Sequence, residues 1–206
     1  MMKLRLLFLI LVCISNAMAA KSFLPKAFKA DFMQKRKSIV SGIVKKSKIT
    51  IKYQYPGNFY LSEGNASSTI YVCNKKKVWV YNPPFVKDEP GHLTIGSGNK
   101  HCYSKIFDSL QHGLVDNKTY KVKKITNTNY ELTFLKEARA QLGVSSLNVH
   151  FKSKKTLFKD IKKLVIHYIK DENILTLESS SLESLTRFPP GTFSFKPPKN
   201  TDVTKM

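Results

Sequence analysis

The sequence predicts a mainly β protein with inserted helices, an α+β fold built on an incomplete, strongly curved antiparallel β-barrel. Short runs rich in β-branched and aromatic residues follow one another, separated by turn signals such as Pro56-Gly57 and Pro83-Pro84. No helical pattern of ten residues alternates with these runs, which argues against parallel βαβ units. A sheet of this length curls, so we expect the helices to cover its concave face.

The first 19 residues are predicted to be a cleaved secretory signal. Lys3 and Arg5 precede an apolar run over residues 6–14, and residues 17–19 (Ala-Met-Ala) form an A-x-A cleavage site. The run is shorter than the roughly 20 residues that a spanning helix needs, although an uncleaved anchor is the alternative. Cys13 lies inside the apolar run, so it does not match the acylated cysteine of a lipoprotein. Residues 20–206 are then expected to form one domain with its own core.

The chain is strongly basic, with a formal net charge of +21, of which Lys3 and Arg5 belong to the expected signal. Such a charge can indicate nucleic acid as a partner, but an exported protein meets anionic lipid surfaces instead. The lysines are spread along the chain rather than clustered, so a solvated surface explains a run such as Lys75-Lys76-Lys77 equally well. We therefore expect no nucleic-acid partner.

Residues 22–37 are predicted to form one amphipathic helix. Ser22 is a suitable N-cap, and the apolar residues recur every three or four positions: Leu24, Phe28, Phe32 and Met33. After this helix the sequence predicts a meander of four neighbouring antiparallel strands, over residues 39–53, 58–64, 67–74 and 77–84.

The last of these strands is apolar on both faces. Val78 and Val80 point to one side, and Trp79, the chain's single tryptophan, points with Tyr81 to the other. A strand that is wet on one face alternates apolar and polar residues, so the second face of this strand must meet another part of the molecule.

A loop is expected over residues 88–100, with a flexible turn at Gly96-Ser97-Gly98, followed by a second helix over residues 101–114 that ends near Gly113. Strands resume near Tyr120, Asn129 and Leu142. Residues 159–171 fit either a helix or a strand, and their β-branched content together with the run at 173–182 favours a strand. A short strand with Phe193 and Phe195 is expected to end at Pro197-Pro198.

No catalytic constellation is found. The sequence contains no H-E-x-x-H, no G-x-S-x-G and no glycine-rich phosphate loop, and the five histidines are scattered. His101 beside Cys102 is a weak metal signal, because no further ligand has the required spacing. We expect no catalytic residue, no metal, no cofactor and no enzymatic activity. Cys73 and Cys102, 29 positions apart, are expected to form a disulfide in an exported chain, with two separate buried thiols as the alternative.

The strands over residues 58–82 carry more large apolar residues than one packed face needs. A filled barrel core and an open cavity both explain the excess. The residues are Phe59, Leu61, Ile70, Val72, Trp79 and Tyr81.

Residues 55–85, YPGNFYLSEGNASSTIYVCNKKKVWVYNPPF, resemble the signature stretch of the bacterial outer-membrane lipoprotein carrier family, LolA. That family has an Arg-Pro-x-x-Phe-x-Trp segment, a strand, a Gly-Lys turn and a Leu-Trp-x-Tyr-Asn-Pro strand. Residues 32–34 (Phe-Met-Gln) match its F-x-Q pattern, and FSFKPPKNTDV resembles its Phe-x-Phe-x-Pro-Pro ending. Pro56 and Phe59 are kept, whereas Tyr55 replaces the family's arginine and Leu61 its tryptophan.

The resemblance implies a barrel closed by a helical lid over an apolar cavity, in a monomeric periplasmic carrier. Such a carrier takes lipidated proteins from an inner-membrane ABC transporter, shields their acyl chains and delivers them to an outer-membrane acceptor. An exported lipid-binding protein or lipoprotein acceptor of the same fold is the alternative, followed by a lipid-active enzyme. The implied cavity and lid residues are Tyr55, Phe59, Leu61, Ile70, Val72, Trp79, Tyr81, Ile106, Phe107 and Leu110.

Two features of the lid follow from these matches. We expect Ile106, Phe107 and Leu110 to face Phe59, Leu61 and Trp79 across the cavity. Because Tyr55 lacks the guanidinium group of the family's arginine, the lid is expected to be latched differently, and a Cys73–Cys102 bond is one candidate tether.

Overall fold

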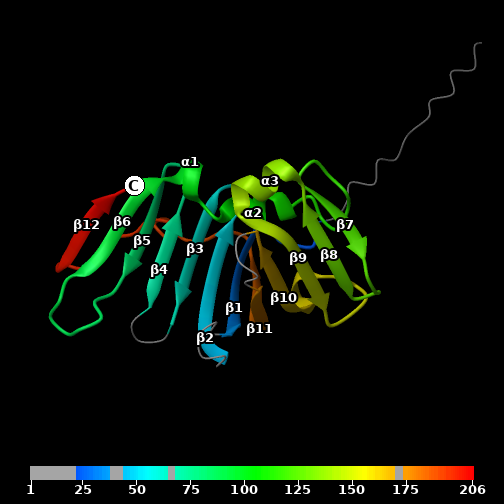
Figure 1. Cartoon of the computed structure of the whole chain (residues 1–206), viewed down its shortest axis with the longest axis horizontal. Helices are drawn as coiled ribbons and strands as arrows, with labels where there is room; N and C mark the ends of the chain where they lie inside the picture. Colours follow the sequence, from blue (N-terminus) through cyan, green and yellow to red (C-terminus); the bar gives the residue numbers. More distant parts are fainter. Residues whose placement is uncertain (1–21, 38–43, 65–67, 170–173) are drawn as a thin grey trace, which may run out of the picture.

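The computed structural model describes residues 22–37, 44–64, 68–169 and 174–206, so the predicted signal and residues 39–43 of the predicted meander lie outside the described part. The described residues form one 12-stranded sheet that curls around a concave face (Figure 1). Its strand order is β12-β6-β5-β4-β3-β2-β1-β11-β10-β9-β8-β7. All neighbouring pairs are antiparallel except β12 and β6, which are parallel. The predicted fold class is therefore confirmed.

The strands of the first half are β1 (Ala27–Lys37), β2 (Val44–Gln54), β3 (Asn58–Glu63), β4 (Thr69–Cys73), β5 (Lys77–Asn82) and β6 (Gly91–Ser97). The helices are α1 (Gly98–His101), α2 (Ser104–Leu110) and α3 (Lys136–Leu142), with a 3-10 turn at Phe158–Asp160. The remaining strands are β7 (Tyr120–Lys124), β8 (Asn129–Phe134), β9 (Val144–Phe151), β10 (Ile161–Tyr168), β11 (Ile174–Leu185) and β12 (Thr201–Lys205).

The prediction of a helix over residues 22–37 is wrong, because β1 is a central strand paired with β2 and β11. Phe28, Ala30, Phe32 and Gln34 are buried, which is the alternation of a strand. Phe28 and Phe32 are four residues apart, a spacing that satisfies both a helical and a strand period. The small Ala30 between them hid the alternation.

Two further predictions are corrected in the connecting regions. The expected loop at 88–100 contains β6 and α1. Gly91 begins β6 under the Tyr81 ring, where an added Cβ would lie 2.6 Å from the Tyr81 hydroxyl, so the glycine there serves packing rather than a loop. The strand expected from Asn129 onward ends at Phe134, because Lys136–Leu142 is rich in helix formers and Gly143, with φ of 68°, ends α3.

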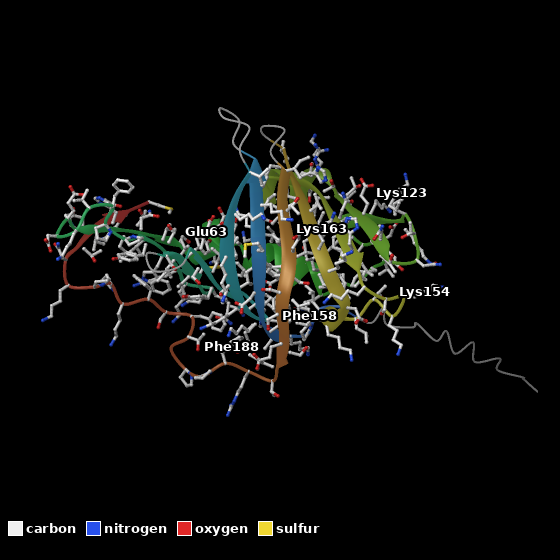
Figure 2. All side chains as sticks on the ribbon, turned by 90° about the horizontal axis from the view of Figure 1, so that it is seen from below. Glu63, Lys123, Lys154, Phe158, Lys163 and Phe188 are labelled. Carbon is white, nitrogen blue, oxygen red and sulfur yellow. A yellow bond between two sulfur atoms is a disulfide. The ribbon has the colours of Figure 1, made fainter. Side chains whose placement is uncertain are left out.

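The predicted strand at Phe193 and Phe195 is also wrong. Residues 186–200 form an irregular segment, which we call the strap, and the last strand is β12, beyond the two prolines. The strap crosses the outer face of the sheet before β12 pairs with β6 (Figure 2). Residues 159–171, which fitted either a helix or a strand, contain the strand β10, so the favoured prediction of a strand is confirmed.

The strap packs against the outer face of β5, the strand that is apolar on both faces. On β5, Trp79 is paired with Val72, and Tyr81 with Ile70, on the outer side of the sheet. The rings of Tyr81 and Phe195 lie 5.2 Å apart. The strap is also held by hydrogen bonds from the Asn74 side-chain amide to the Phe193 carbonyl (3.0 Å) and from the Phe188 N–H to Gln54 Oε1 (2.8 Å).

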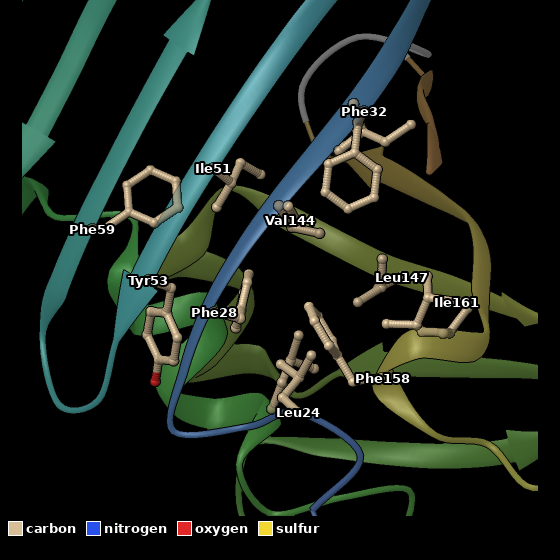
Figure 3. Packing of buried hydrophobic residues seen from close by; sticks show 14 of the residues in the cluster. Leu24, Phe28, Phe32, Ile51, Tyr53, Phe59, Val144, Leu147, Phe158 and Ile161 are labelled. Carbon is tan, nitrogen blue, oxygen red and sulfur yellow. The ribbon is translucent and has the colours of Figure 1, made fainter. Parts of the chain in front are cut away.

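The hydrophobic core lies on the concave face. Its centre is an aromatic cluster in which the ring of Phe28 lies 5.3 Å from Tyr53 and 4.8 Å from Phe158 (Figure 3). Phe28, Tyr53 and Phe59 are at most 2% exposed. This cluster is the floor on which the helix α2 rests.

Candidate functional site

The helix α2 lies on the concave face with Phe107 inserted into the aromatic cluster. The Phe107 ring stacks on Phe59 at 5.3 Å and lies 5.4 Å from Tyr53 and 5.8 Å from Phe28. Leu110 is 3% exposed, and Ile106 packs against the same core. The apolar residues of this short helix thus cover the floor, as a lid would.

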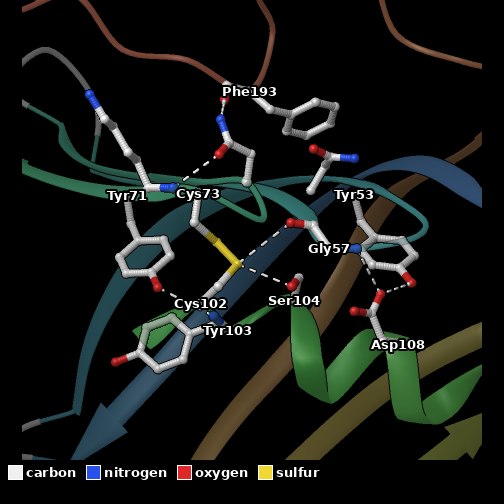
Figure 4. Close-up of a disulfide and its surroundings, with 12 residues drawn as sticks. Tyr53, Gly57, Tyr71, Cys73, Cys102, Tyr103, Ser104, Asp108 and Phe193 are labelled. Atoms are coloured by element: carbon white, nitrogen blue, oxygen red, sulfur yellow. Dashed lines mark hydrogen bonds between the residues drawn. A yellow bond between two sulfur atoms is a disulfide. The ribbon is translucent and has the colours of Figure 1, made fainter. Parts of the chain in front are cut away.

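The polar face of α2 is fixed to the sheet through Asp108. Its Oδ1 atom accepts a hydrogen bond from the Tyr53 hydroxyl (2.8 Å) and another from the Gly57 N–H (3.1 Å) (Figure 4). Burial raises the pKa of Tyr53, and the hydrogen bond with the Asp108 carboxylate raises it further. The phenol therefore remains protonated and can donate to Asp108.

The N-terminal end of α2 is tied covalently to β4. The expected disulfide is confirmed: Cys73 is bonded to Cys102, with Cα atoms 5.7 Å apart, and Cys102 lies directly before the segment that begins α2. The ring of Tyr103 stacks on the ring of Tyr71 at 4.7 Å, and the backbone N–H of Tyr103 donates a hydrogen bond to the Tyr71 hydroxyl (3.2 Å). Because Cys102 is bonded to sulfur, it is not available as the metal ligand considered from the sequence.

The C-terminal end of α2 is held by the residues that precede β1. The side-chain amide of Gln111 donates to the Pro25 carbonyl (3.3 Å), and the Ser22 hydroxyl donates to Gln111 Oε1 (3.5 Å). These are neutral hydrogen bonds at half-exposed positions, so they are weaker than the attachments at the other end.

The structure brings together only part of the predicted cavity. Cross-strand pairing places Phe59 and Leu61 on the concave face, in the rows of Tyr53 and Ile51, where the lid residues of α2 also lie. Tyr55 is 44% exposed in the turn after β2, and the hydroxyl that reaches α2 belongs to Tyr53.

Four predicted cavity residues lie on the opposite face. Val72 is paired with Trp79, and Ile70 with Tyr81, so these four side chains share one face of the sheet. Val72 is next to Cys73, which is paired with Phe59 on the concave face. Because successive residues of a strand point to opposite faces, the four residues lie on the outer face. Trp79 therefore does not face α2, and this part of the prediction is corrected. The apolar excess in these strands comes from two buried faces rather than from one cavity.

Sequence reasoning missed the residues that make the floor and the latch: Phe28, Tyr53, Tyr71, Asp108 and Phe158. Had residues 27–37 been predicted as a strand, Phe28 would have been expected on the concave face. The role of Asp108 has no local signal, because its partners are 55 and 51 positions away.

The concave side is not completely filled. A cavity of about 320 Å³ remains between β4, β5 and the helices, lined mainly by Tyr71, Val78, Val80, Tyr103 and Leu142. It lies beside the disulfide, at the fixed end of α2. A wider hollow of about 680 Å³ lies under the strap, and Gln54, Asn58, Asn74 and Arg187 are among the residues that line it.

In the described part of the chain, no helix combines the length and the apolar character required to span a bilayer. The candidate site thus consists of an aromatic floor, a helix that covers it, and attachments that are strong at one end of the helix and weaker at the other.

Comparison with known proteins gives one family. The sequence model described as "Outer membrane lipoprotein carrier protein LolA" matches residues 25–196. Among solved structures, an uncharacterized conserved protein from Thermus thermophilus is similar, with 11% identity over 92% of this chain and 96% of that chain and a TM-score of 0.49. A LolA superfamily protein from Nitrosomonas europaea has 9% identity over 86% of this chain and 94% of that chain, with a TM-score of 0.43. No curated protein matches the chain.

Proposed function

The chain belongs to the LolA family of outer membrane lipoprotein carrier proteins, and from this premise we propose that it carries lipoproteins by enclosing their acyl chains between the concave face and α2. It acts by binding rather than by catalysis. In this proposal Phe107 packs where an acyl chain would lie once α2 moves aside.

The observation that carries this proposal is the position of Phe107. Its ring contacts Phe28, Tyr53 and Phe59, which come from three different strands of the floor. If α2 swings away, these rings present an apolar surface that an acyl chain can cover. The cavity beside Tyr71 and Tyr103 extends this surface.

The energies favour such an exchange. Transfer from water is worth about 0.8 kcal/mol per methylene, so a 16-carbon chain gains roughly 12 kcal/mol on burial. Lifting Ile106, Phe107 and Leu110 off the floor costs at most roughly 5–9 kcal/mol, because the value of about 1.5–3 kcal/mol for each side chain applies to full burial and two of the three are partly buried. One chain is therefore enough to displace the lid, and closure of the lid on release recovers about half of the lost burial.

The partners follow from the family rather than from the geometry. Cargo is a lipidated protein, the donor is an ABC transporter of the inner membrane, and the recipient is a lipoprotein acceptor in the outer membrane. The predicted signal at residues 1–19 supports export to the periplasm. A monomer is proposed, because α2 and the floor that it covers both belong to one chain.

A site-specific crosslink tests the proposal. A benzophenone amino acid at Phe107 is expected to capture a synthetic triacylated lipopeptide on irradiation, because that position lies on the floor. The matched control carries the same group at Ile125, which is 51% exposed in the turn between β7 and β8. Equal capture at both positions, or capture at neither, would contradict the proposal.

A further inference from the structure

A second surface lies on the outer face of the sheet, where β2, β1, β11 and β10 run side by side (Figure 2). Cross-strand pairing puts lysines and exposed aliphatic side chains together there. Lys35 is paired with Lys46, Met33 with Lys48 and with Glu178, and Glu178 with Lys163. We give the name outer patch to these lysines and Met33, together with Val44 and Ile174 at the strand ends: Met33, Lys35, Val44, Lys46, Lys48, Lys163 and Ile174.

The aliphatic members of the outer patch are open to solvent, both Met33 inside the central strand β1 and the two residues at strand ends. Met33 is 37% exposed, and Val44 and Ile174 are each 52% exposed. They point away from the concave face, because their neighbours Phe32 and Leu177 on the same strands are buried in the core. The carrier cavity therefore makes no use of them.

The outer patch carries an excess of positive charge. It surrounds two acids: Glu178, paired with Lys35 at 2.7 Å, and Asp31, 4.0 Å from Lys48. The hydrogen bond from Lys35 lowers the pKa of Glu178, and the charges of Lys35, Lys163 and Lys46 lower it further. Burial lowers the pKa of His150, which lies opposite Lys163, and the charges of Lys163 and Lys162 add to this.

We propose that the outer patch binds the surface of an anionic phospholipid bilayer. Lysines that surround exposed aliphatic side chains suit the boundary between headgroups and acyl chains, where the ammonium groups meet lipid phosphates and the apolar groups enter the interface. The positive charge comes from three of these strands, β2, β1 and β10, which suits an extended anionic surface better than a discrete acidic peptide.

This inference builds on the proposed carrier function, since it gives the carrier a way to reach the membranes between which cargo moves. The outer patch and α2 lie on opposite faces of the sheet, so a protein bound through the patch keeps its lid free. Membrane binding can also be measured without cargo, which separates the two proposals.

Flotation with large unilamellar vesicles tests the proposal. The protein is expected to float with vesicles of phosphatidylcholine and phosphatidylglycerol (70:30) at 50 mM salt, to bind at least tenfold less at 500 mM salt, and not to float with pure phosphatidylcholine. The triple variant Lys46→Gln, Lys48→Gln and Lys163→Gln is expected to lose at least tenfold in affinity. Ser in place of Val44 and Ile174 is expected to weaken binding about threefold to tenfold.

The matched control replaces Lys152, Lys154 and Lys199 with Gln, which removes the same charge from exposed positions elsewhere. It is expected to bind within twofold of the unchanged protein. Equal losses in both triple variants, binding that ignores phosphatidylglycerol, or binding to polyglutamate without binding to vesicles would each overturn the proposal. The outer-patch variants are expected to hold triacylated lipopeptide in detergent-free solution as the unchanged protein does, whereas failure of the carrier function would abolish this in all variants.

Discussion

Replacement of Asp108 with Ala is predicted to loosen the lid and to tighten cargo binding. The substitution removes the acceptor of the hydrogen bonds from the Tyr53 hydroxyl (2.8 Å) and the Gly57 N–H (3.1 Å). Hydrogen bonds to a charged group are worth about 1.5–3 kcal/mol each, and the half-exposed position of Asp108 places the pair at the low end, about 2–3 kcal/mol in total.

This energy shifts the balance between closed and open lid by roughly 30–150-fold, since each 1.4 kcal/mol corresponds to a factor of ten. Because the lid competes with the acyl chain for the floor, the apparent Kd for a fluorescent triacylated lipopeptide is expected to fall at least tenfold. The free energy of unfolding in urea is expected to fall by about 2–3 kcal/mol. Asp108→Asn, which retains an oxygen acceptor, is expected to give smaller changes in the same directions.

The matched control is Asp202→Ala, which removes the same charge from an exposed position on β12. It is expected to leave both quantities unchanged. The reasoning would be refuted if Asp108→Ala lost the predicted stability but bound the lipopeptide no more tightly, because the latch would then not oppose cargo.

Three further predictions concern the disulfide, a buried tyrosine and the corrected face of β5. Replacing Cys73 and Cys102 with Ser is expected to lower the free energy of unfolding by about 3–4 kcal/mol, as judged by urea denaturation, and reductant is expected to do the same to the unchanged protein. Burial raises the pKa of Tyr120 from 10.0 to about 12, so the contribution of this shift to stability is complete below pH 10 and is lost as the pH rises toward 12. In the Tyr120→Phe variant the free energy of unfolding is expected to decline less steeply between pH 10 and pH 12. A decline as steep as that of the unchanged protein would contradict this. Lipopeptide with brominated acyl chains is expected to leave the fluorescence of Trp79 nearly unquenched, because Trp79 lies on the outer face. The same lipopeptide is expected to quench the tryptophan of a Leu61→Trp, Trp79→Phe variant, because Leu61 lies on the concave face. Strong quenching of Trp79 would show that Trp79 contacts the acyl chains.

The strands β2 to β5 could be predicted from the sequence because turn residues separate them. The runs before Pro56-Gly57 and Pro83-Pro84 gave β2 and β5 within a few residues. β1 could not be predicted in this way, because Phe28 and Phe32 satisfy two periods at once, and only pairing with β2 and β11 decides between them.

The site itself was predictable only in part. Apolar spacing placed Ile106, Phe107 and Leu110 on one side of a helix, and the two cysteines that remain after the predicted signal indicated the disulfide. The hydrogen bond between Tyr53 and Asp108 that latches the lid could not be predicted, because it depends on how the whole sheet curls. The error at Trp79 came from turning the wrong face of β5 toward the cavity, because the register with β4 and the strap on the outer face could not be read from the sequence.

The central claim is that acyl chains replace α2 on the concave face, and hydrogen exchange measured by mass spectrometry with and without triacylated lipopeptide tests it most directly. The account predicts opposite changes in one experiment: faster exchange in Ser104–Leu110 as the lid is displaced, and slower exchange in the floor strands Ala27–Lys37 and Asn58–Glu63. Unchanged exchange in α2 together with protection confined to the strap would contradict the account and would place the lipid on the outer face.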